Sequence, residues 1–330
     1  MKLAKLSIGN IKLDNNVILA PMAGITDSPL RRLAKNGGAG LVYTEMICAK
    51  SILHNSKKVK SLLRISYDEK PISVQIFGDD AYTMAEAAKT IRDMDIDIID
   101  INLGCPANKI IKTGAGSKLL ANEKLVSKIL EYVVKSVDIP VTAKIRIGLL
   151  PGENIAPRII KIAQNCGVKM VAIHARPASQ KHFGNPNLKL FDDACRCAKI
   201  PIVANGGIID EKTAIDFMKI PNCKGIMIGR GAIGNYSIFK KLVDFFNSGK
   251  NLSLTSTSKI ERIIWLKKHI EYSTEHYGEE MGLIVIRKII NYYIRNLPNA
   301  ARIREVFNKI NTLSDFNKLV RFFGLFDINL

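Results

Sequence analysis

Eight short runs of apolar, mostly β-branched residues recur along the chain, and a helical pattern follows each of them. Turns that contain Gly or Pro separate the units, which is typical of repeated βα units. Strands buried on both faces favour a parallel sheet, and eight of them within about 250 residues favour a closed (β/α)₈ barrel, the TIM barrel, over an open sheet. The predicted strands occupy residues 17–20, 41–44, 72–77, 97–102, 141–145, 170–174, 202–205 and 225–229.

Two further segments flank this pattern. Residues 6–13 alternate around a Gly-Asn pair, which predicts a small hairpin before the barrel. A polar stretch at 247–258 predicts a linker, so that residues 1–246 form the barrel and 259–330 a second domain. Apolar residues of this second domain follow the helical period and predict about four amphipathic helices, enough for a small bundle. Two examples of the pattern are Ile286, Ile289, Ile290 and Tyr293, and Ile303, Val306, Phe307, Ile310 and Leu313.

The chain is strongly basic, with 49 Lys and Arg against 30 Asp and Glu and a formal net charge of +19. This favours a polyanionic partner, because neutralising phosphates releases counterions. The alternative is a compositional bias, since Lys, Ile and Asn are abundant throughout.

No apolar run approaches the roughly 20 residues needed to cross a bilayer, and no signal-peptide segment follows Met1, so we expect a cytoplasmic protein. The six cysteines form no C-x-x-C pair, so we expect no metal site.

Polar residues and glycines gather where the predicted strands end. In a barrel of this type the C-terminal ends of the strands carry the chemistry, whereas a purely structural barrel needs neither kind of residue there. The segments at these ends are Pro21-Met22-Ala23-Gly24, Gln75, Asn102-Leu103-Gly104-Cys105-Pro106, Lys144 and Arg146, His174-Ala175-Arg176, Asn205-Gly206-Gly207 and Gly229-Arg230-Gly231.

The loops after the last two strands predict a phosphate site. Their glycines occupy the places where barrels often hold a phosphate with backbone N–H groups and the start of a following helix. Arg230 adds a charged hydrogen-bonding fork. The alternative is that Gly206, Gly207, Gly229 and Gly231 only make tight turns.

Lys144 lies on a strand that should be buried, so it needs an anionic partner or a depressed pKa. A reduced flavin offers such a partner, because it carries negative charge near N1 and the C2 carbonyl, and Gln75 and Asn205 can hydrogen-bond its edge. A Schiff-base lysine, as in an aldolase, is the alternative. His174 alone would be weak evidence, but its place beside Arg176 after the sixth strand favours contact with a cofactor.

Cys105 is the most informative single candidate for a catalytic residue. Gly104 and Pro106 place it in a loop at the barrel mouth, whereas a free cysteine is usually only a small buried apolar residue. A thiol held over a bound flavin can act as a general acid that protonates carbon while hydride reaches the neighbouring atom. Lys109 and Lys112 follow in a basic loop that could contact phosphate, with an ordinary solvated loop as the alternative.

These motifs together resemble the tRNA-dihydrouridine synthases over nearly the whole chain, and the Asn-x-Gly-Cys-Pro segment is the most specific of them. Pro21 to Asp27, Lys144-x-Arg146-x-Gly148, His174-x-Arg176, Asn205-Gly206 and Gly229-Arg230 complete the series. Arg287-Lys288, Tyr292-Tyr293, Leu297 to Ala300 and Arg302-Ile303-Arg304 look like the helical tRNA-binding domain of the bacterial B-type branch.

The resemblance implies an FMN enzyme that takes hydride from NADPH or NADH and delivers it to C6 of a uridine in tRNA, while Cys105 protonates C5. It also implies that Asn102 and Arg176 face the uracil and that tRNA binds through Arg287, Lys288 and Arg304, with Lys109 and Lys112 as further contacts. Separately, we expect a monomer. By motif position, FMN would be held by Pro21, Met22, Ala23, Gln75, Lys144, His174, Asn205, Gly206, Gly207, Gly229 and Arg230.

The chain departs from the family pattern at a few places. Pro177 and Ala178 stand where the family usually has Thr-Arg, Gly207 where it often has Asp, and Ile289 where it often has His. Two competing hypotheses keep part of the pattern. A flavin barrel acting on a small pyrimidine such as dihydroorotate would have no evident use for a basic helical domain, and a non-catalytic RNA-binding protein with a degenerate barrel would bind no flavin.

Overall fold

The computed structural model describes residues 5–248, 258–295 and 297–322. Eight parallel strands follow one another in the order β3-β11-β10-β9-β8-β7-β6-β4. A parallel bridge between Ile18 and Leu41 closes the ring beside β4, so the predicted barrel is confirmed. The strands are β3 (Val17–Leu19), β4 (Val42–Tyr43), β6 (Ile72–Phe77), β7 (Ile98–Leu103), β8 (Val141–Arg146), β9 (Val171–His174), β10 (Ile202–Asn205) and β11 (Cys223–Ile228), and a short β5 (Ile47–Cys48) also pairs with β6.

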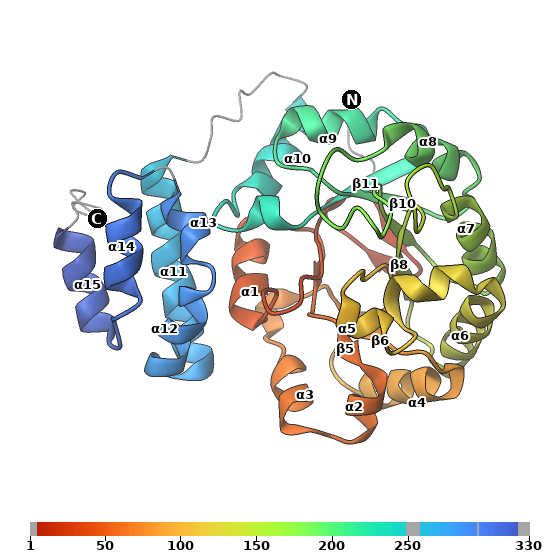
Figure 1. Cartoon of the computed structure of the whole chain (residues 1–330), viewed down its shortest axis with the longest axis horizontal. Helices are drawn as coiled ribbons and strands as arrows, with labels where there is room; N and C mark the ends of the chain where they lie inside the picture. Colours follow the sequence, from red (N-terminus) through yellow and green to blue (C-terminus); the bar gives the residue numbers. More distant parts are fainter. Residues whose placement is uncertain (1–4, 249–257, 296, 323–330) are drawn as a thin grey trace.

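Helices surround the strands on the outside of the barrel (Figure 1). Several begin at a side chain that accepts a hydrogen bond from a backbone N–H in the first turn, as Asp27, Asp80, Asn122, Asn187 and Asp210 do. The helices of the barrel are α1 (Ser28–Asn36), α2 (Ala49–Leu53), α3 (Lys57–Leu62), α4 (Ala81–Arg92), α5 (Asn108–Ile111), α6 (Glu123–Ser136), α7 (Ala156–Asn165), α8 (Leu188–Arg196), α9 (Glu211–Met218) and α10 (Ile238–Ser248), with 3₁₀ turns η1 (Tyr67–Glu69), η2 (Gly116–Ala121) and η3 (Arg230–Ala232).

An N-terminal hairpin closes one end of the barrel. Strands β1 (Ser7–Ile8) and β2 (Ile11–Lys12) pair antiparallel, within the segment where the alternation predicted a hairpin. Leu6, Ile8 and Leu13 are buried in one apolar cluster with residues of the barrel interior such as Ile98 and Met170. This end of the barrel is therefore filled with apolar side chains, which leaves the opposite end, where the strands finish, for chemistry.

In the described residues after the barrel, the structure has five helices instead of about four. They are α11 (Lys259–Tyr277), α12 (Glu279–Arg287), α13 (Ile290–Ile294), α14 (Ala300–Phe307) and α15 (Leu313–Phe322). Two runs that the spacing predicts as continuous are broken, because Ile289 and Ile310 lie in turns between helices. Both side chains are nevertheless buried, so the apolar period continues across the turns although the helix does not. Of the predicted linker, residues 249–257 lie outside the described part, while residues 247 and 248 belong to α10.

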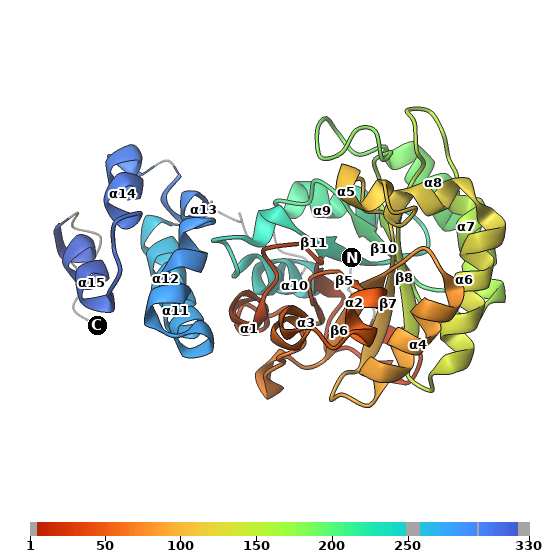
Figure 2. The same cartoon turned by 60° about the horizontal axis from the view of Figure 1, so that its bottom comes forward.

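The second domain packs against the barrel beside α1, as both views show (Figures 1 and 2). The Arg32 guanidinium lies 3.9 Å from the ring centroid of Tyr272 and also pairs with Glu275. Tyr277, at the end of α11, donates a hydrogen bond of 3.1 Å to Asp27. Contacts of several kinds thus join α11 to α1.

Within the described ranges, no helix is both long enough and apolar enough to span a membrane. The same residues contain no group of three or more His, Cys, Asp or Glu side chains that could hold a metal ion.

Candidate active site

The strand register brings the predicted site residues together at the open end of the barrel. Asn102 on β7 lies opposite Lys144 on β8, and Arg146 lies opposite His174 on β9. His174 in turn lies opposite Asn205 on β10. Because parallel strands end on the same face, side chains scattered over a hundred residues of sequence share one mouth.

A chain of buried hydrogen bonds connects the barrel interior to the Cys105 loop. Asp100 accepts hydrogen bonds from Thr142 Oγ1 at 2.6 Å and from Gln75 Nε2 at 2.7 Å. The Oε1 atom of Gln75 accepts from Asn102 Nδ2 at 2.8 Å. Asn102 Oδ1 then accepts from the backbone N–H groups of Gly104 and Cys105, at 3.1 and 2.9 Å. Each amide is oriented by the next, so the loop is fixed from inside the barrel.

Two further contacts hold Cys105 at the mouth. Arg146 Nε donates to the Gly104 carbonyl at 2.9 Å, and Ser117 N donates to the Cys105 carbonyl at 3.0 Å. Gly116 packs so closely that a Cβ on it would lie 2.7 Å from the Cys105 carbonyl oxygen. The Cys105 side chain is half-buried, as the sequence predicts for a thiol presented in a loop.

Three cations at the mouth have neutral hydrogen-bond acceptors among the described residues. Lys144 Nζ donates to Asn205 Oδ1 at 2.9 Å, and Asn205 donates to the Met227 carbonyl at 2.7 Å. Arg146 donates to the carbonyls of Gly104, Pro177 and Lys181, and Arg176 to the carbonyl of Gly184. The site therefore holds buried positive charge that an anionic ligand would neutralise.

Burial dominates the electrostatics of these groups. The pKa of Lys144 is lowered to about 8, mainly by burial and then by the nearby Arg146, against the opposing effect of Asp100. Burial likewise lowers the pKa of Arg146 to about 10. Burial and the surrounding cations hold the pKa of His174 well below its usual value. His174 is therefore a neutral imidazole at physiological pH, and its Nε2 lies 3.1 Å from an Arg176 nitrogen.

The glycine loops meet beside His174 and Arg176. Gly206 and Gly207 have φ of +118° and +75°, and a Cβ on Gly206 would lie 2.7 Å from His174 Cδ2. Only glycine fits this close approach. A Cβ on Gly229 would lie 3.6 Å from Met22 Sδ, so the Pro21-Met22-Ala23 segment adjoins the loop after β11. Arg230 is exposed and donates to the His182 carbonyl at 3.2 Å.

The predicted tRNA contacts lie in two places. Lys109 and Lys112 are exposed on and beside α5, in the segment that follows Cys105. Lys288 and Arg304 are exposed in the second domain, whereas Arg287 is partly buried. Arg287 donates to the Ile310 carbonyl at 2.6 Å and to Asn311, so it holds the turn between α14 and α15.

Sequence reasoning assigned no role to Asp100, Arg146 or His182. Arg146 follows Lys144 by two positions in a strand, so the two side chains lie on the same face of that strand. This spacing could have identified Arg146 as a residue of the site. The ring of His182 stacks on that of His174 with centroids 5.9 Å apart. Nothing local predicts this contact, because His182 lies in a loop.

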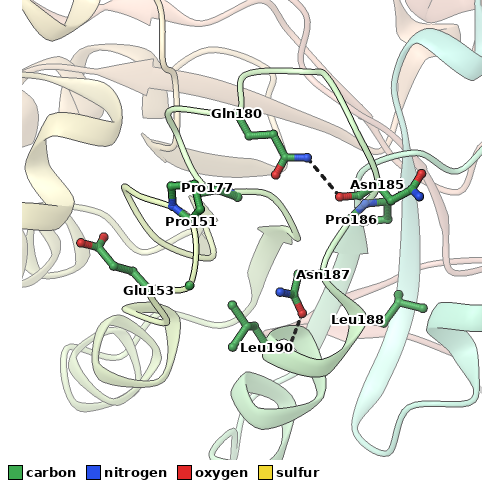
Figure 3. Close-up of a pocket in the computed structure, with 10 residues that line it drawn as sticks. Pro151, Glu153, Pro177, Gln180, Asn185, Pro186, Asn187, Leu188 and Leu190 are labelled. Atoms are coloured by element: carbon green, nitrogen blue, oxygen red, sulfur yellow. Dashed lines mark hydrogen bonds between the residues drawn. The ribbon is translucent and has the colours of Figure 1, made fainter.

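A hollow of about 400 Å³ lies beside the site but does not contain it (Figure 3). It lies between the loop after β8 and the loop after β9, and α8 begins at its edge. Neither a predicted cofactor residue nor a Lys, Arg or His side chain is among those that line it, which makes it unsuited to a phosphate. The lining residues are Pro151, Gly152, Glu153, Pro177, Gln180, Asn185, Pro186, Asn187, Leu188 and Leu190.

Comparison with known proteins identifies the family to which the chain belongs. Residues 18–325 match the family model described as dihydrouridine synthase. The chain belongs to the dihydrouridine synthase family. A relative from Pseudomonas syringae pv. tomato, tRNA-dihydrouridine synthase B, is 38% identical and the match covers 92% of this chain and 89% of that one. The match to a probable tRNA-dihydrouridine synthase from Rickettsia prowazekii, also 38% identical, covers 92% of each chain. Relatives of the B type thus support membership of the B-type branch.

Solved structures resemble the chain in fold. An old yellow enzyme homologue from Zymomonas mobilis has a TM-score of 0.57 at 13% sequence identity, and the match covers 78% of this chain and 95% of that one. Histamine dehydrogenase from Rhizobium sp. 4-9 has a TM-score of 0.58 at 13% identity, over 81% of this chain and 50% of that one. At such identity the likeness concerns the barrel fold alone.

The structure shows the surroundings of the residues that depart from the dihydrouridine synthase pattern. The Pro177 carbonyl accepts a hydrogen bond of 3.0 Å from Arg146, a contact that does not depend on its side chain. Gly207 has a left-handed backbone that an Asp would strain. Ile289 is buried between α12 and α13, so it contributes to packing of the second domain.

Proposed function

We propose that the protein reduces the C5–C6 bond of a uridine in tRNA to give dihydrouridine, with Cys105 as the proton donor. The observation that carries the proposal is the placement of Cys105. Its loop is held by Asn102 and Arg146 at the mouth of a barrel where Lys144 and Arg146 donate hydrogen bonds to neutral acceptors. Membership of the dihydrouridine synthase family and the names of the tRNA-modifying relatives support the same reaction.

The residues at the mouth fit FMN as the cofactor. The half-buried Lys144, whose hydrogen-bond acceptor among the described residues is the neutral Asn205, suits the negative N1 and C2 carbonyl region of a reduced flavin. Gly206 and Gly207 leave backbone next to Arg176 without side chains in the way, which suits a phosphate. The remaining residues assigned to FMN by motif position are Pro21, Met22, Ala23, Gln75, His174 and Gly229.

When bound, FMN would supply hydride, taken from NADPH or NADH, to C6 of the uracil. The Cys105 thiol donates its proton to C5 and becomes a thiolate, which solvent then reprotonates. Arg146, which donates to the Gly104 carbonyl, holds the loop that carries this thiol. Asn102 keeps the thiol in place through the loop, and Arg176 faces the substrate from the loop after β9.

The substrate base must leave its stack to reach this site. A uracil inside a folded tRNA cannot present its C5–C6 bond to the mouth of a barrel, so the uridine has to be unstacked and inserted. The exposed Lys109, Lys112, Lys288 and Arg304 supply phosphate contacts that position the RNA without reading its sequence.

The experiment is nucleoside mass analysis of unmodified tRNA incubated with the protein, FMN and NADPH. We expect uridine to gain two hydrogens with the wild type and Cys105→Ala to lower that rate by about 100-fold or more, because the proton donor is removed. Cys197→Ala is the matched control, since Cys197 is exposed outside the mouth. Equal rates for wild type and Cys105→Ala would refute the role of Cys105. Turnover of a free pyrimidine but not of tRNA would refute the substrate.

A further inference from the structure

The loop between β9 and α8 presents an aromatic ring to solvent. Phe183 is 77% exposed, in a segment that we call the Gln180–Asn185 loop. Burial of a phenylalanine ring is favourable. An exposed ring on a loop held by hydrogen bonds is therefore an apolar surface that a partner can cover.

Side chains hold the backbone of this loop at every residue from Lys181 to Asn185. Arg146, Arg176 and Arg230 reach it from the site, and Gln180 bonds it from within, as Figure 3 shows for Asn185. The five successive carbonyls accept as follows: Lys181 from Arg146 at 2.8 Å, His182 from Arg230 at 3.2 Å, Phe183 from Gln180 at 2.5 Å, Gly184 from Arg176 at 2.8 Å and Asn185 from Gln180 at 3.1 Å.

The loop takes its shape without the Phe183 side chain. Lys181 and Gly184 have left-handed φ of 51° and 64°, which turn the chain on either side of the ring. A Cβ on Gly184 would lie 2.7 Å from Gln180 Nε2, so the carboxamide fills the inside of the turn. Each of these five side-chain hydrogen bonds ends on a backbone carbonyl. Replacing Phe183 therefore removes a surface and leaves the scaffold.

The surroundings of the ring are cationic and adjoin the site. His182, the residue before Phe183, stacks on His174, which is one of the predicted cofactor contacts. Lys181 and Arg230 are exposed beside it. An exposed aromatic ring among cations matches a single-stranded nucleic acid, whose bases stack on the ring while its phosphates meet the charges.

We propose that Phe183 is a stacking platform for an unpaired base next to the uridine that enters the site. The proposal rests on the proposed function. A uridine that leaves its stack deprives a neighbouring base of a stacking partner, and the Phe183 ring takes that place. Because the loop is already ordered, binding costs little conformational entropy there. Stacking on a ring tolerates any base, so the platform holds the RNA without specifying sequence.

The kinetic test compares variants at this position with tRNA as the varied substrate. We expect Phe183→Ala to raise KM for tRNA by about 5- to 100-fold while kcat changes by less than about twofold, as loss of one base–aromatic stack predicts. Phe183→Tyr should keep the wild-type KM, and Phe183→Leu should fall between the two. Tyr132→Ala is the control, because Tyr132 is a half-exposed aromatic near the C-terminus of α6, at the other end of the barrel. An unchanged KM for Phe183→Ala would overturn the proposal.

A binding test separates this inference from the proposed function. The chain has one tryptophan, Trp265, so Phe183→Trp adds a fluorophore at the loop whose emission a stacked base quenches. We expect unmodified tRNA to quench the added emission, relative to wild type, without NADPH present. Absence of quenching would overturn the platform even if uridine is reduced. If the wild type reduces no uridine, the proposed function fails, and quenching by tRNA still decides whether the loop stacks a base.

Discussion

At the scale of single residues, Asp100 is the group on which the orientation of the site depends. Its carboxylate accepts from both Thr142 and Gln75, and an asparagine offers one acceptor and adds a donor. We expect Asp100→Asn to lower the free energy of unfolding by about 1–3 kcal/mol, since a buried donor loses its partner. The substitution should also slow uridine reduction, because Gln75 and Asn102 no longer hold the Cys105 loop in one arrangement.

Urea unfolding and tRNA turnover measure the two effects. The same change removes a negative charge that raises the pKa of Lys144, so that pKa, about 8 in the wild type, should fall further. Asp93→Asn is the control, since Asp93 is 74% exposed at the outer surface. Full stability together with full activity in Asp100→Asn would show that the orientation of Gln75 does not depend on this carboxylate.

The residues of the site were predictable to different degrees. Lys144, His174 and Asn205 could be placed because each stands at the end of an apolar strand, and the barrel brings such ends together. The hydrogen bonds that arrange the site could not be predicted, because the three loop carbonyls to which Arg146 donates lie more than thirty positions from it in the sequence. Arg287 was predicted as an RNA contact and is bound to a neighbouring turn, because its type and position in the motif do not reveal its partners.

At the scale of elements, a buried hydrogen-bond chain fastens the second domain to the barrel. Tyr236, in the loop before α10, lies 3.0 Å from Tyr293 on α13, oxygen to oxygen, and His269 Nδ1 on α11 lies 2.6 Å from the same hydroxyl. Burial lowers the pKa of His269 to about 3, while it raises the pKa of both tyrosines. All three groups are therefore neutral between pH 4 and 8.

This hydrogen-bond chain makes the stability of the folded protein sensitive to acid. The unfolded state binds a proton at His269 below its ordinary pKa of about 6.5, and the folded state does so only near 3, so stability falls as the pH falls between these values. At pH 5 the loss from this group is about 2 kcal/mol. We expect His269→Asn, which keeps a polar atom near the position of Nδ1, to be less stable than wild type at pH 7 but to lose less stability on acidification.

Urea unfolding at pH 7, 6 and 5 gives the comparison. His54→Asn is the matched control, because His54 is exposed and its replacement should leave the pH dependence of the wild type. A parallel loss of stability in His269→Asn and wild type would mean that other groups cause the acid sensitivity.

Secondary structure could be predicted where burial follows a simple period. The apolar runs locate the barrel strands to within two residues at each end, because parallel strands buried on both faces leave little other use for such runs. The second domain was harder. Ile289 and Ile310 continue the helical spacing through turns that also face the core, so periodicity alone could not find the ends of α12 and α14.

At the scale of the whole molecule, the second domain is a fixed extension of the barrel. Ile263, Leu266 and Tyr293 are buried, and the Trp265 and Tyr236 rings meet with centroids 5.4 Å apart. Removing the domain would therefore expose apolar surface on the barrel, and such a truncation would confound binding with stability. Surface charge is the cleaner way to ask whether the second domain contacts RNA.

The exposed cations Lys288 and Arg304 allow that question to be asked without disturbing the core. We expect Lys288→Gln and Arg304→Gln each to raise KM for tRNA and to make the dependence of log affinity on log salt shallower by about 0.7–0.9, as loss of one phosphate contact predicts. Lys135→Gln, which removes an exposed cation paired with Glu131 on α6, should change neither. Filter binding at several salt concentrations measures the slope. If both variants keep the wild-type slope, the RNA does not touch this part of the second domain, and the cations at the barrel mouth carry the electrostatic contacts.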